Sequence, residues 1–210
     1  MPYPLLVVTA VTAEAEAVRA GADPGHVLVE PVGVGPAAAA AGTARLLATG
    51  RYRAVISAGI AGGFPGRAPV GATVLGTRSV AADLGAESPD GFLPIEELGF
   101  GSSLLVADPL LLKGLTAALP EAITGDVLTL ATVTGAATTA NTLATRFPQA
   151  VAEAMEGFGV ATAASGANIP FLELRTISNP IGPRDRAAWR LKEAFAALST
   201  ASGALWTACG

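Results

Sequence analysis

Residues 170–186, Pro-Phe-Leu-Glu-Leu-Arg-Thr-Ile-Ser-Asn-Pro-Ile-Gly-Pro-Arg-Asp-Arg, hold the pattern that decides the fold and places its chemistry. The segment begins as a short apolar run, which indicates a buried strand over 171–177, and then turns polar before proline and glycine stop it. Ligands of open α/β sheets bind just beyond the carboxyl ends of the strands. A strand that ends in Ser178 and Asn179 therefore predicts a functional site at that edge of a sheet.

Apolar runs and helical patterns alternate along the rest of the chain. Strands are expected at 5–10, 27–32, 54–58, 73–77, 126–133 and 150–154, and helices at 12–19, 36–47, 109–119, 138–146, 157–167 and 187–206. Each expected strand is a continuous apolar run, which is typical of parallel strands covered on both faces. The pattern predicts a three-layer α/β fold with a mostly parallel, twisted central sheet flanked by helices.

Glycine and proline mark two of the expected connections, a Gly-rich loop at 59–63 and a long loop at 88–102. Long loops in compact proteins are often functional. The Ala-rich helix that begins at Pro36 is apolar almost all round, which predicts that it is buried. No linker or repeat interrupts the chain, so we expect one domain over 1–210.

The composition limits the classes of partner. The 210 residues are 51% hydrophobic and 14% charged, with a net charge of −4, so a sizeable core is expected and a basic surface for nucleic acid is not. No apolar run reaches the length of a membrane span, and residues 1–10 lack the basic start of a signal peptide. So much apolar surface with so few charges predicts a homodimer or larger homo-oligomer.

Cysteine and histidine are each used once, at Cys209 and His26. This excludes a disulfide within the chain and disfavours a His-rich metal site. We therefore expect no metal, no cofactor and a reduced, cytoplasmic setting.

The turn Gly-Val-Gly-Pro-Ala-Ala at 33–38 fits a loose dinucleotide-binding pattern. It follows the second expected strand instead of the first, and no acidic residue stands about 20 positions later to hold a ribose hydroxyl. A tight turn before a packed helix explains it more simply. A third interpretation is a pocket of backbone N–H groups for a small anion at the helix N-terminus.

Two carboxylates stand out by their surroundings. Glu14 lies near an expected helix start, where favourable pairing with the helix dipole is a simpler explanation than catalysis. Its neighbour Glu16 should face solvent. Glu156 lies in the apolar stretch 152–159, where a carboxylate is costly unless it is hydrogen-bonded. It would either accept two hydroxyl hydrogen bonds from a sugar diol or serve as a helix N-terminal charge, and the local sequence leaves both open.

Asn179 offers a donor and an acceptor together, which suits a ring nitrogen beside a carbonyl group. The alternative is an ordinary turn-forming residue before proline. Behind it, Arg184, Asp185 and Arg186 would be either site residues or an exposed ion-pair cluster.

Taken together, these positions resemble the purine nucleoside phosphorylase/nucleosidase superfamily over nearly the whole chain. The motifs are Glu14, the turn at 33–35, Ser-Ala-Gly-Ile-Ala-Gly-Gly at 57–63, Met-Glu at 155–156 and Ile-Ser-Asn at 177–179. Within the superfamily, residues 83–87, 89–92, 175–179 and 182–186 with Trp189 resemble the futalosine hydrolases. That family cleaves the N-glycosidic bond of futalosine and releases hypoxanthine in an alternative menaquinone pathway.

The resemblance implies roles for individual residues. Glu14 would activate the attacking water, while Glu156 would hold the ribose hydroxyls with Met155 against the sugar. Asn179 stands where adenine-releasing relatives have an acidic Asp, which is consistent with a 6-oxopurine base, and Asp185 is the nearest alternative acid. Further substrate contacts are expected from Ile60, Gly62 and Phe158, and the aromatic carboxylate of futalosine would be received by Arg184, Arg186 or the loop 88–102.

The same resemblance leaves the nucleophile to be decided. Phosphate would need Arg or Lys facing the sugar, and the segments 33–36 and 59–63 contain neither, which favours water. Arg67 and Arg78 remain open as phosphate ligands. The alternatives are another purine nucleosidase of the methylthioadenosine/S-adenosylhomocysteine type, a purine nucleoside phosphorylase, or a nucleoside-binding module without turnover.

Overall fold

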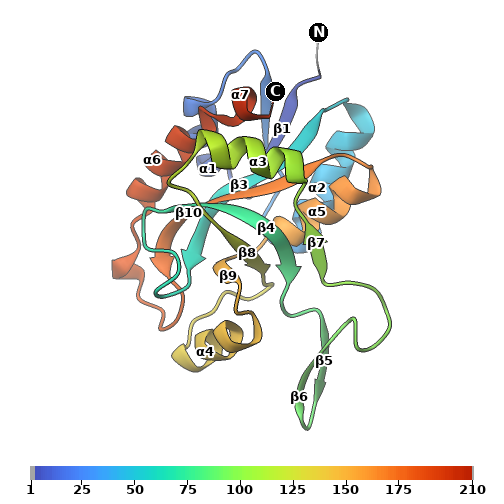
Figure 1. Cartoon of the computed structure of the whole chain (residues 1–210), viewed down its shortest axis with the longest axis vertical. Coiled ribbons are helices and arrows are strands. Elements are labelled where there is room, and N and C mark those ends of the chain that lie inside the picture. Colours follow the sequence, from blue (N-terminus) through green and yellow to red (C-terminus); the bar gives the residue numbers. More distant parts are fainter. Residues whose placement is uncertain (1–2, 210) are drawn as a thin grey trace.

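The computed structural model describes residues 3–209, which form one large mixed sheet with helices on both faces (Figure 1). The strands are β1 (Leu5–Thr9), β2 (Val27–Pro31), β3 (Ala54–Gly63), β4 (Thr73–Ala81), β5 (Gly85–Ser88), β6 (Gly91–Pro94), β7 (Leu104–Val106), β8 (Ile123–Thr129), β9 (Ala150–Ala154) and β10 (Phe171–Pro180). The helices are α1 (Thr12–Gly21), α2 (Pro36–Thr49), α3 (Pro109–Ala118), α4 (Ala137–Arg146), α5 (Gly157–Gly166), the 3-10 turn η1 (Arg186–Ala188), α6 (Leu191–Ser202) and α7 (Leu205–Ala208).

The strands of the main sheet follow the order β10-β4-β8-β9-β3-β1-β2, and β7 pairs with β4. The β1–β2, β1–β3, β3–β10, β4–β8 and β8–β9 pairs are parallel, so the predicted mostly parallel sheet is confirmed. An additional pairing of β10 with β3 closes strands β3, β9, β8, β4 and β10 into a ring, which the sequence patterns did not predict. The closure depends on the length of β3, because residues 54–57 pair with β1 while Gly62 and Gly63 pair with β9.

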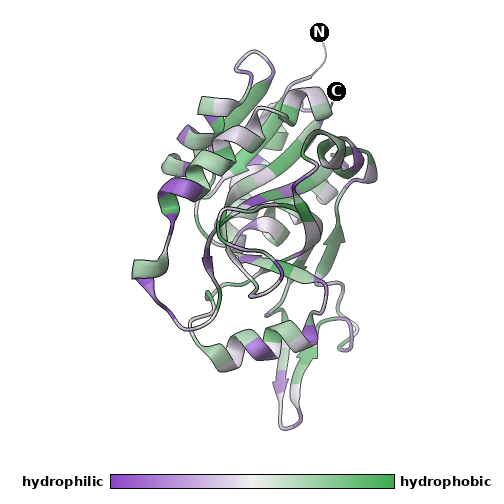
Figure 2. Cartoon of the chain, turned by 60° about the vertical axis from the view of Figure 1, so that its left-hand side comes forward, coloured by the Kyte–Doolittle hydropathy of each residue, from purple (hydrophilic) through white to green (hydrophobic). Residues whose placement is uncertain are grey.

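The predicted three layers are confirmed by two apolar cores on opposite faces of the sheet. One core packs side chains of α1, α3, α6 and α7, such as Val18, Leu115 and Leu198, against the strands. The other packs α2 and α5 through Ala39 and Val160. Figure 2 shows predominantly hydrophobic strands lying between helices in which hydrophobic and hydrophilic residues are mixed. Within residues 3–209, no helix is both long and apolar enough to cross a membrane.

Several predicted boundaries are wrong. Residues 59–63, expected as a loop, continue strand β3, and the predicted loop 88–102 contains β6, which forms with β5 the hairpin that projects from the body in Figure 1. Strand β8 begins at Ile123 and ends at Thr129, so it is shifted from the prediction, and the closing helix is divided into η1, α6 and α7. Glycine suits the close packing inside the ring, because a Cβ at Gly63 would lie 2.2 Å from the Ala68 carbonyl oxygen.

The expectation that the Ala-rich helix is buried is also wrong. In α2, Pro36 takes the first turn as predicted, but within this helix the buried residues are Ala39, Gly42 and Thr43. Alanine is apolar yet small, so a helix of alanines is tolerated in solvent on its outer side and gives little sign of which face packs.

Candidate active site

A pocket opens where the ends of β1, β3, β9 and β10 meet, at the edge of the sheet that the strand pattern predicted. Its wall is formed by Ala10, Val11, Glu14, Val34, Ile60, Ala61, Gly62, Val133, Thr134, Glu153, Ala154, Met155, Glu156, Ser178, Asn179, Pro180, Ile181, Gly182, Pro183, Arg184, Asp185 and Trp189. The pocket therefore brings together residues from the first and last parts of the chain.

Glu14 reaches the pocket from the first turn of α1, and 4% of its surface is exposed. One carboxylate oxygen accepts hydrogen bonds from the backbone N–H groups of Ala10 at 2.9 Å and Val11 at 3.3 Å. The other accepts from the N–H of Ile60 on β3 at 2.9 Å. The bonds from Ala10 and Val11 place Glu14 at the start of α1, as the simpler interpretation proposed. The bond from Ile60 also holds its carboxyl group against β3, at the edge of the sheet.

Glu156 lies between β9 and α5, and its carboxylate is held by two backbone N–H groups. Gly35 donates to Oε1 at 3.2 Å, and Met155 donates to Oε2 at 3.3 Å. Gly35 has a φ of 89°, a conformation that favours glycine and that turns its N–H toward the carboxylate. The 33–38 turn thus supplies an N–H group to an anion, and that anion is a side chain of the same molecule.

A buried arginine, Arg175, lies behind the two acids; it belongs to the 175–179 motif, but the sequence alone assigned it no role. It lies on β10 with 1% of its surface exposed. Its Nε donates to Glu173 Oε1 at 2.8 Å, its Nη2 donates to Ser57 Oγ at 3.1 Å, and its Nη1 lies 3.6 Å from Glu156 Oε2. Glu173 and Arg175 stand two apart in an apolar strand and so share a face, which was the available signal for a buried charge network.

The guanidinium of Arg175 also lies near Glu14, because both groups reach the space beside Gly59 of β3. A Cβ at Gly59 would lie 2.5 Å from Glu14 Oε1 and 2.7 Å from Arg175 Nη1, so both charged groups occupy the space that a side chain would fill. The guanidinium is therefore ion-paired with carboxyl groups of β10 and the β9–α5 junction, and the carboxyl group of Glu14 on α1 lies nearby.

Burial sets the electrostatics of this cluster. It raises the pKa of Glu14, against the opposing effects of Arg175 and the Ile60 N–H, and the nearby Glu156 raises it further. Burial likewise raises the pKa of Glu173, although Arg175 and Ser79 oppose it. Burial alone would lower the pKa of Arg175, but Glu173, Glu156 and Glu14 outweigh this and raise it. A cluster with more acids than bases favours holding a proton on a carboxyl group.

Asn179 lies half-buried near the end of β10, where the pairing with β3 shifts in register between Ile177 and Asn179. Its Oδ1 accepts from the Ser178 hydroxyl at 2.8 Å, and its Nδ2 donates to the Pro180 carbonyl at 3.0 Å. The amide is thereby oriented with one N–H and one acceptor lone pair still available.

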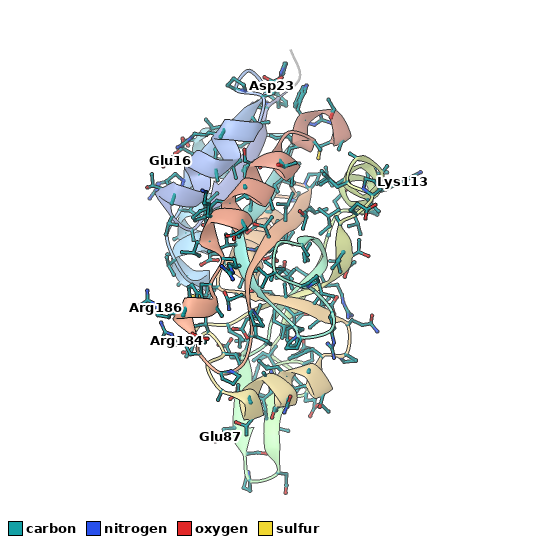
Figure 3. All side chains as sticks on the ribbon, turned by 90° about the vertical axis from the view of Figure 1, so that its left-hand side faces the viewer. Glu16, Asp23, Glu87, Lys113, Arg184 and Arg186 are labelled. Atoms are coloured by element: carbon teal, nitrogen blue, oxygen red, sulfur yellow. The ribbon has the colours of Figure 1, made fainter. Side chains whose placement is uncertain are left out.

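The remaining predicted site residues divide into two groups. Ile60, Gly62, Met155, Arg184 and Asp185 lie in the pocket wall, whereas Phe158 is not part of it. Figure 3 shows the side chains of Arg184 and Arg186 at the outer surface of the molecule. The wall includes an aromatic side chain whose position the strand and helix patterns did not indicate, that of Trp189, just beyond η1.

The two arginines left open as phosphate ligands are occupied elsewhere. Arg67 donates to the backbone carbonyls of Ala144, Phe147 and Ala150. Arg78 pairs with the Asp126 carboxylate.

Comparison with known proteins identifies the family of the chain. Residues 10–209 match the family model of the phosphorylase superfamily, so the chain belongs to that superfamily. It is 50% identical to the futalosine hydrolase of Streptomyces coelicolor, over 96% of this chain and 94% of that protein, and 45% identical to that of Acidothermus cellulolyticus, over 96% and 91%. Within the superfamily, it is a member of the futalosine hydrolase family.

A solved structure also confirms the fold. The methylthioadenosine/S-adenosylhomocysteine nucleosidase of Streptococcus pneumoniae, determined in complex with 8-aminoadenine, aligns with a TM-score of 0.84 at 18% identity, over 98% of this chain and 99% of that one.

Proposed function

We propose that this protein hydrolyses the N-glycosidic bond of futalosine and releases hypoxanthine. The observation that carries the proposal is the convergence of Glu14, Glu156 and Asn179 on the wall of one pocket, with the buried Arg175 behind the two acids. Breaking this bond develops positive charge on the ribose and negative charge on the base. Fixed groups that already point at these charges stabilise the transition state without reorganising.

Glu14 takes the proton from the attacking water. General-base catalysis of this kind contributes about 10²–10⁴-fold, and it is most effective when the base has a pKa near the working pH. Burial raises the pKa of Glu14 toward that range, and hydrogen bonds from the N–H groups of Ala10, Val11 and Ile60 keep the carboxyl group in place. When ionised, Glu14 also favours the cationic sugar.

Glu156 accepts hydrogen bonds from the ribose hydroxyls, with Met155 beside the sugar. Gly35 and Met155 hold its carboxylate from the backbone side, so lone pairs remain for the substrate. Fixing the sugar against the water converts an encounter into a positioned reaction, an effect that amounts to several kcal/mol in well-oriented systems, on the order of 7–11 at most.

Asn179 contacts the departing base. Ser178 and Pro180 orient its amide, and the free N–H and free lone pair suit a ring nitrogen beside a carbonyl. Asp185 is the weaker candidate for this role because its carboxylate accepts from the Ala187 N–H at 2.9 Å and caps η1.

Water is the nucleophile in this proposal. Arg67 and Arg78 are engaged by backbone carbonyls and by Asp126, and Arg175 is engaged by Glu173 and Ser57. Arg184, at the mouth of the pocket, is assigned to the carboxylate at the far end of futalosine, with Trp189 beside the aromatic group.

The test is the release of free hypoxanthine from futalosine without added phosphate. Inosine and methylthioadenosine serve as comparison substrates. Turnover that needs phosphate or arsenate would instead identify a phosphorylase, release of adenine alone would identify another nucleosidase, and binding without release would identify a binding module.

A cytoplasmic homo-oligomer completes the proposal. Large apolar side chains on the outside of the chain, such as Phe100, Val106 and Leu110, are 80%, 68% and 78% exposed, which supports a subunit interface. Analytical ultracentrifugation measures the oligomer directly, and a monomer at working concentration would contradict this part.

A further inference from the structure

Glu153 is a buried carboxylate in the pocket wall to which the mechanism above gives no task. It lies on β9, and 4% of its surface is exposed. Its Oε1 accepts from the Thr134 backbone N–H at 2.6 Å, and its Oε2 accepts from the Thr134 hydroxyl. Its partners among the described residues are thus neutral donors from one residue. Burial raises its pKa, while the Thr134 hydrogen bonds oppose the rise. Such a group is costly unless a further donor reaches it.

The sheet register aligns Glu153 with Asn179. Glu153 is paired with Gly62 on β3, and Gly62 is paired with Asn179 on β10. Directly paired residues project to the same face of a sheet, so the two polar side chains flank a glycine on one side of the pocket. A Cβ at Gly62 would lie 3.6 Å from Asn179 Nδ2 and 2.6 Å from the Ile181 Cγ2 methyl group. Two strand spacings separate Glu153 from Asn179, about 9–10 Å, which is the span of a planar base with a hydrogen bond at each side.

The two side chains offer complementary hydrogen-bonding groups to a purine. Asn179 offers a donor and an acceptor, whereas each oxygen of the Glu153 carboxylate has a lone pair beyond the one that Thr134 uses. A 6-oxopurine presents acceptors at O6 and N7 and a donor at N1–H. Adenine presents a bare lone pair at N1 and would set it against the carboxylate.

We infer that Glu153 accepts the N1–H hydrogen bond of the 6-oxopurine while Asn179 contacts the O6/N7 edge, so that Glu153 determines selectivity for hypoxanthine over adenine. The inference rests on the proposed function and adds the residue that distinguishes the base. A site that must hydrogen-bond a substrate N–H rejects an analogue without it, because the buried acceptor is then unpaired.

Glu153 also anchors the segment around Thr134, and the experiment must separate this role from selectivity. Thr134→Val removes the hydroxyl donor and keeps the carboxylate, so it disturbs the anchor alone. Glu153→Gln replaces one acceptor oxygen by an amide that can donate to adenine N1. The two variants form a matched pair around one contact.

The first measurement uses the wild-type protein and needs no turnover. Binding of hypoxanthine, 1-methylhypoxanthine and adenine is compared by calorimetry, and we expect the two bases without N1–H to bind about 10- to 100-fold more weakly, the size of one hydrogen bond to a charged group. Equal binding of hypoxanthine and 1-methylhypoxanthine would overturn the inference, whether or not any variant folds.

The second measurement compares the preference for inosine over adenosine, as a ratio of kcat/KM, in wild type, Glu153→Gln and Thr134→Val. We expect Glu153→Gln to reduce the ratio about tenfold or more and Thr134→Val to leave it unchanged. An unchanged ratio in Glu153→Gln, or an equal fall in both variants, would assign Glu153 to the anchor alone. Failure of the wild type to release hypoxanthine from futalosine would instead refute the proposed function, while the binding comparison still decides on Glu153.

Discussion

Replacing Gly59 by alanine tests whether the position of Glu14 matters for catalysis. The new Cβ would lie 2.5 Å from Glu14 Oε1, 3.0 Å from its Cδ and 2.7 Å from Arg175 Nη1. Ordinary contacts of a Cβ lie at about 3.4 Å or more, so the carboxyl group and the guanidinium must each move by roughly 1 Å. Glu14 cannot move that far and keep its 2.9 Å bonds to both Ala10 and Ile60.

Two magnitudes follow from this displacement. Overpacking of a closely packed interior costs about 1–3 kcal/mol of folding free energy, so the variant should still fold. A misplacement of about 1 Å in a catalytic geometry costs on the order of 10²-fold in turnover. We therefore expect kcat for hypoxanthine release to fall about a hundredfold in a protein with a modestly lowered denaturation midpoint.

The assay measures kcat at saturating futalosine together with urea denaturation followed by circular dichroism. Gly166→Ala is the matched control, because no neighbouring atom lies within 4 Å of the added Cβ at this end of α5. It should leave kcat unchanged and stabilise the fold by about 0.4–1 kcal/mol. A folded Gly59→Ala protein with the kcat of the wild type would refute the argument that Glu14 must stay above Gly59.

Three further outcomes are expected. Glu14→Gln should lower kcat by about 10²–10⁴-fold with futalosine binding largely kept, whereas Glu16→Gln, on the outer face of the same helix in Figure 3, should not change it; equal rates would remove Glu14 from the mechanism. Asn179→Asp should reduce release of hypoxanthine and shift the preference toward adenine nucleosides, which kinetics with futalosine, inosine and methylthioadenosine would detect. For Glu153, the folded-state pKa is raised, so its contribution to stability is complete below about pH 4.5 and is lost as the pH rises through that folded pKa. The free energy of unfolding of the wild type, measured in urea relative to that of Glu153→Gln, should therefore fall between pH 4.5 and pH 8. A difference that stays constant over this range would contradict the raised pKa.

The sequence was informative where function depends on local pattern. The strand that ends in Ser178 and Asn179 indicated a site at the carboxyl edge of the sheet. For Glu14 and Glu156 the local pattern left a helix-terminal role open, and the resemblance to the nucleosidase superfamily implied their roles. Glu14, Glu156 and Asn179 all lie in the pocket wall. The register that sets Asn179 beside Gly62 depends on an irregularity in β10, and periodicity does not reveal where a strand shifts by one residue.

The glycines at 59–63 show why other parts of the fold could not be predicted from the sequence. Glycine favours turns in isolation, so a loop was the natural prediction for this segment. In the folded chain the same residues are strand, because distant groups approach the backbone and leave no room for side chains. Glu14 and Arg175 both approach Gly59, and Ile181 covers Gly62. Contacts between residues far apart in sequence decide the conformation here, and local propensity does not contain them.

Arg175 and backbone N–H groups hold the two acids in place. A fully buried guanidinium is tolerated only when charged or polar partners surround it, and removing such a partner typically costs about 3–5 kcal/mol. This chain supplies those partners as Glu173 of β10, Glu156 of the β9–α5 junction and the Ser57 hydroxyl, and Glu14 of α1 adds a further negative charge nearby. Burial of Arg175 on β10 therefore favours the approach of the β9–α5 junction, which brings Glu156 within 3.6 Å of the guanidinium. Glu14 is held by the backbone N–H groups of Ala10, Val11 and Ile60. Glu156 is held by the ion pair with Arg175 and by the N–H groups of Gly35 and Met155. The fold therefore fixes the two carboxyl groups that we assign to water and ribose before a substrate enters.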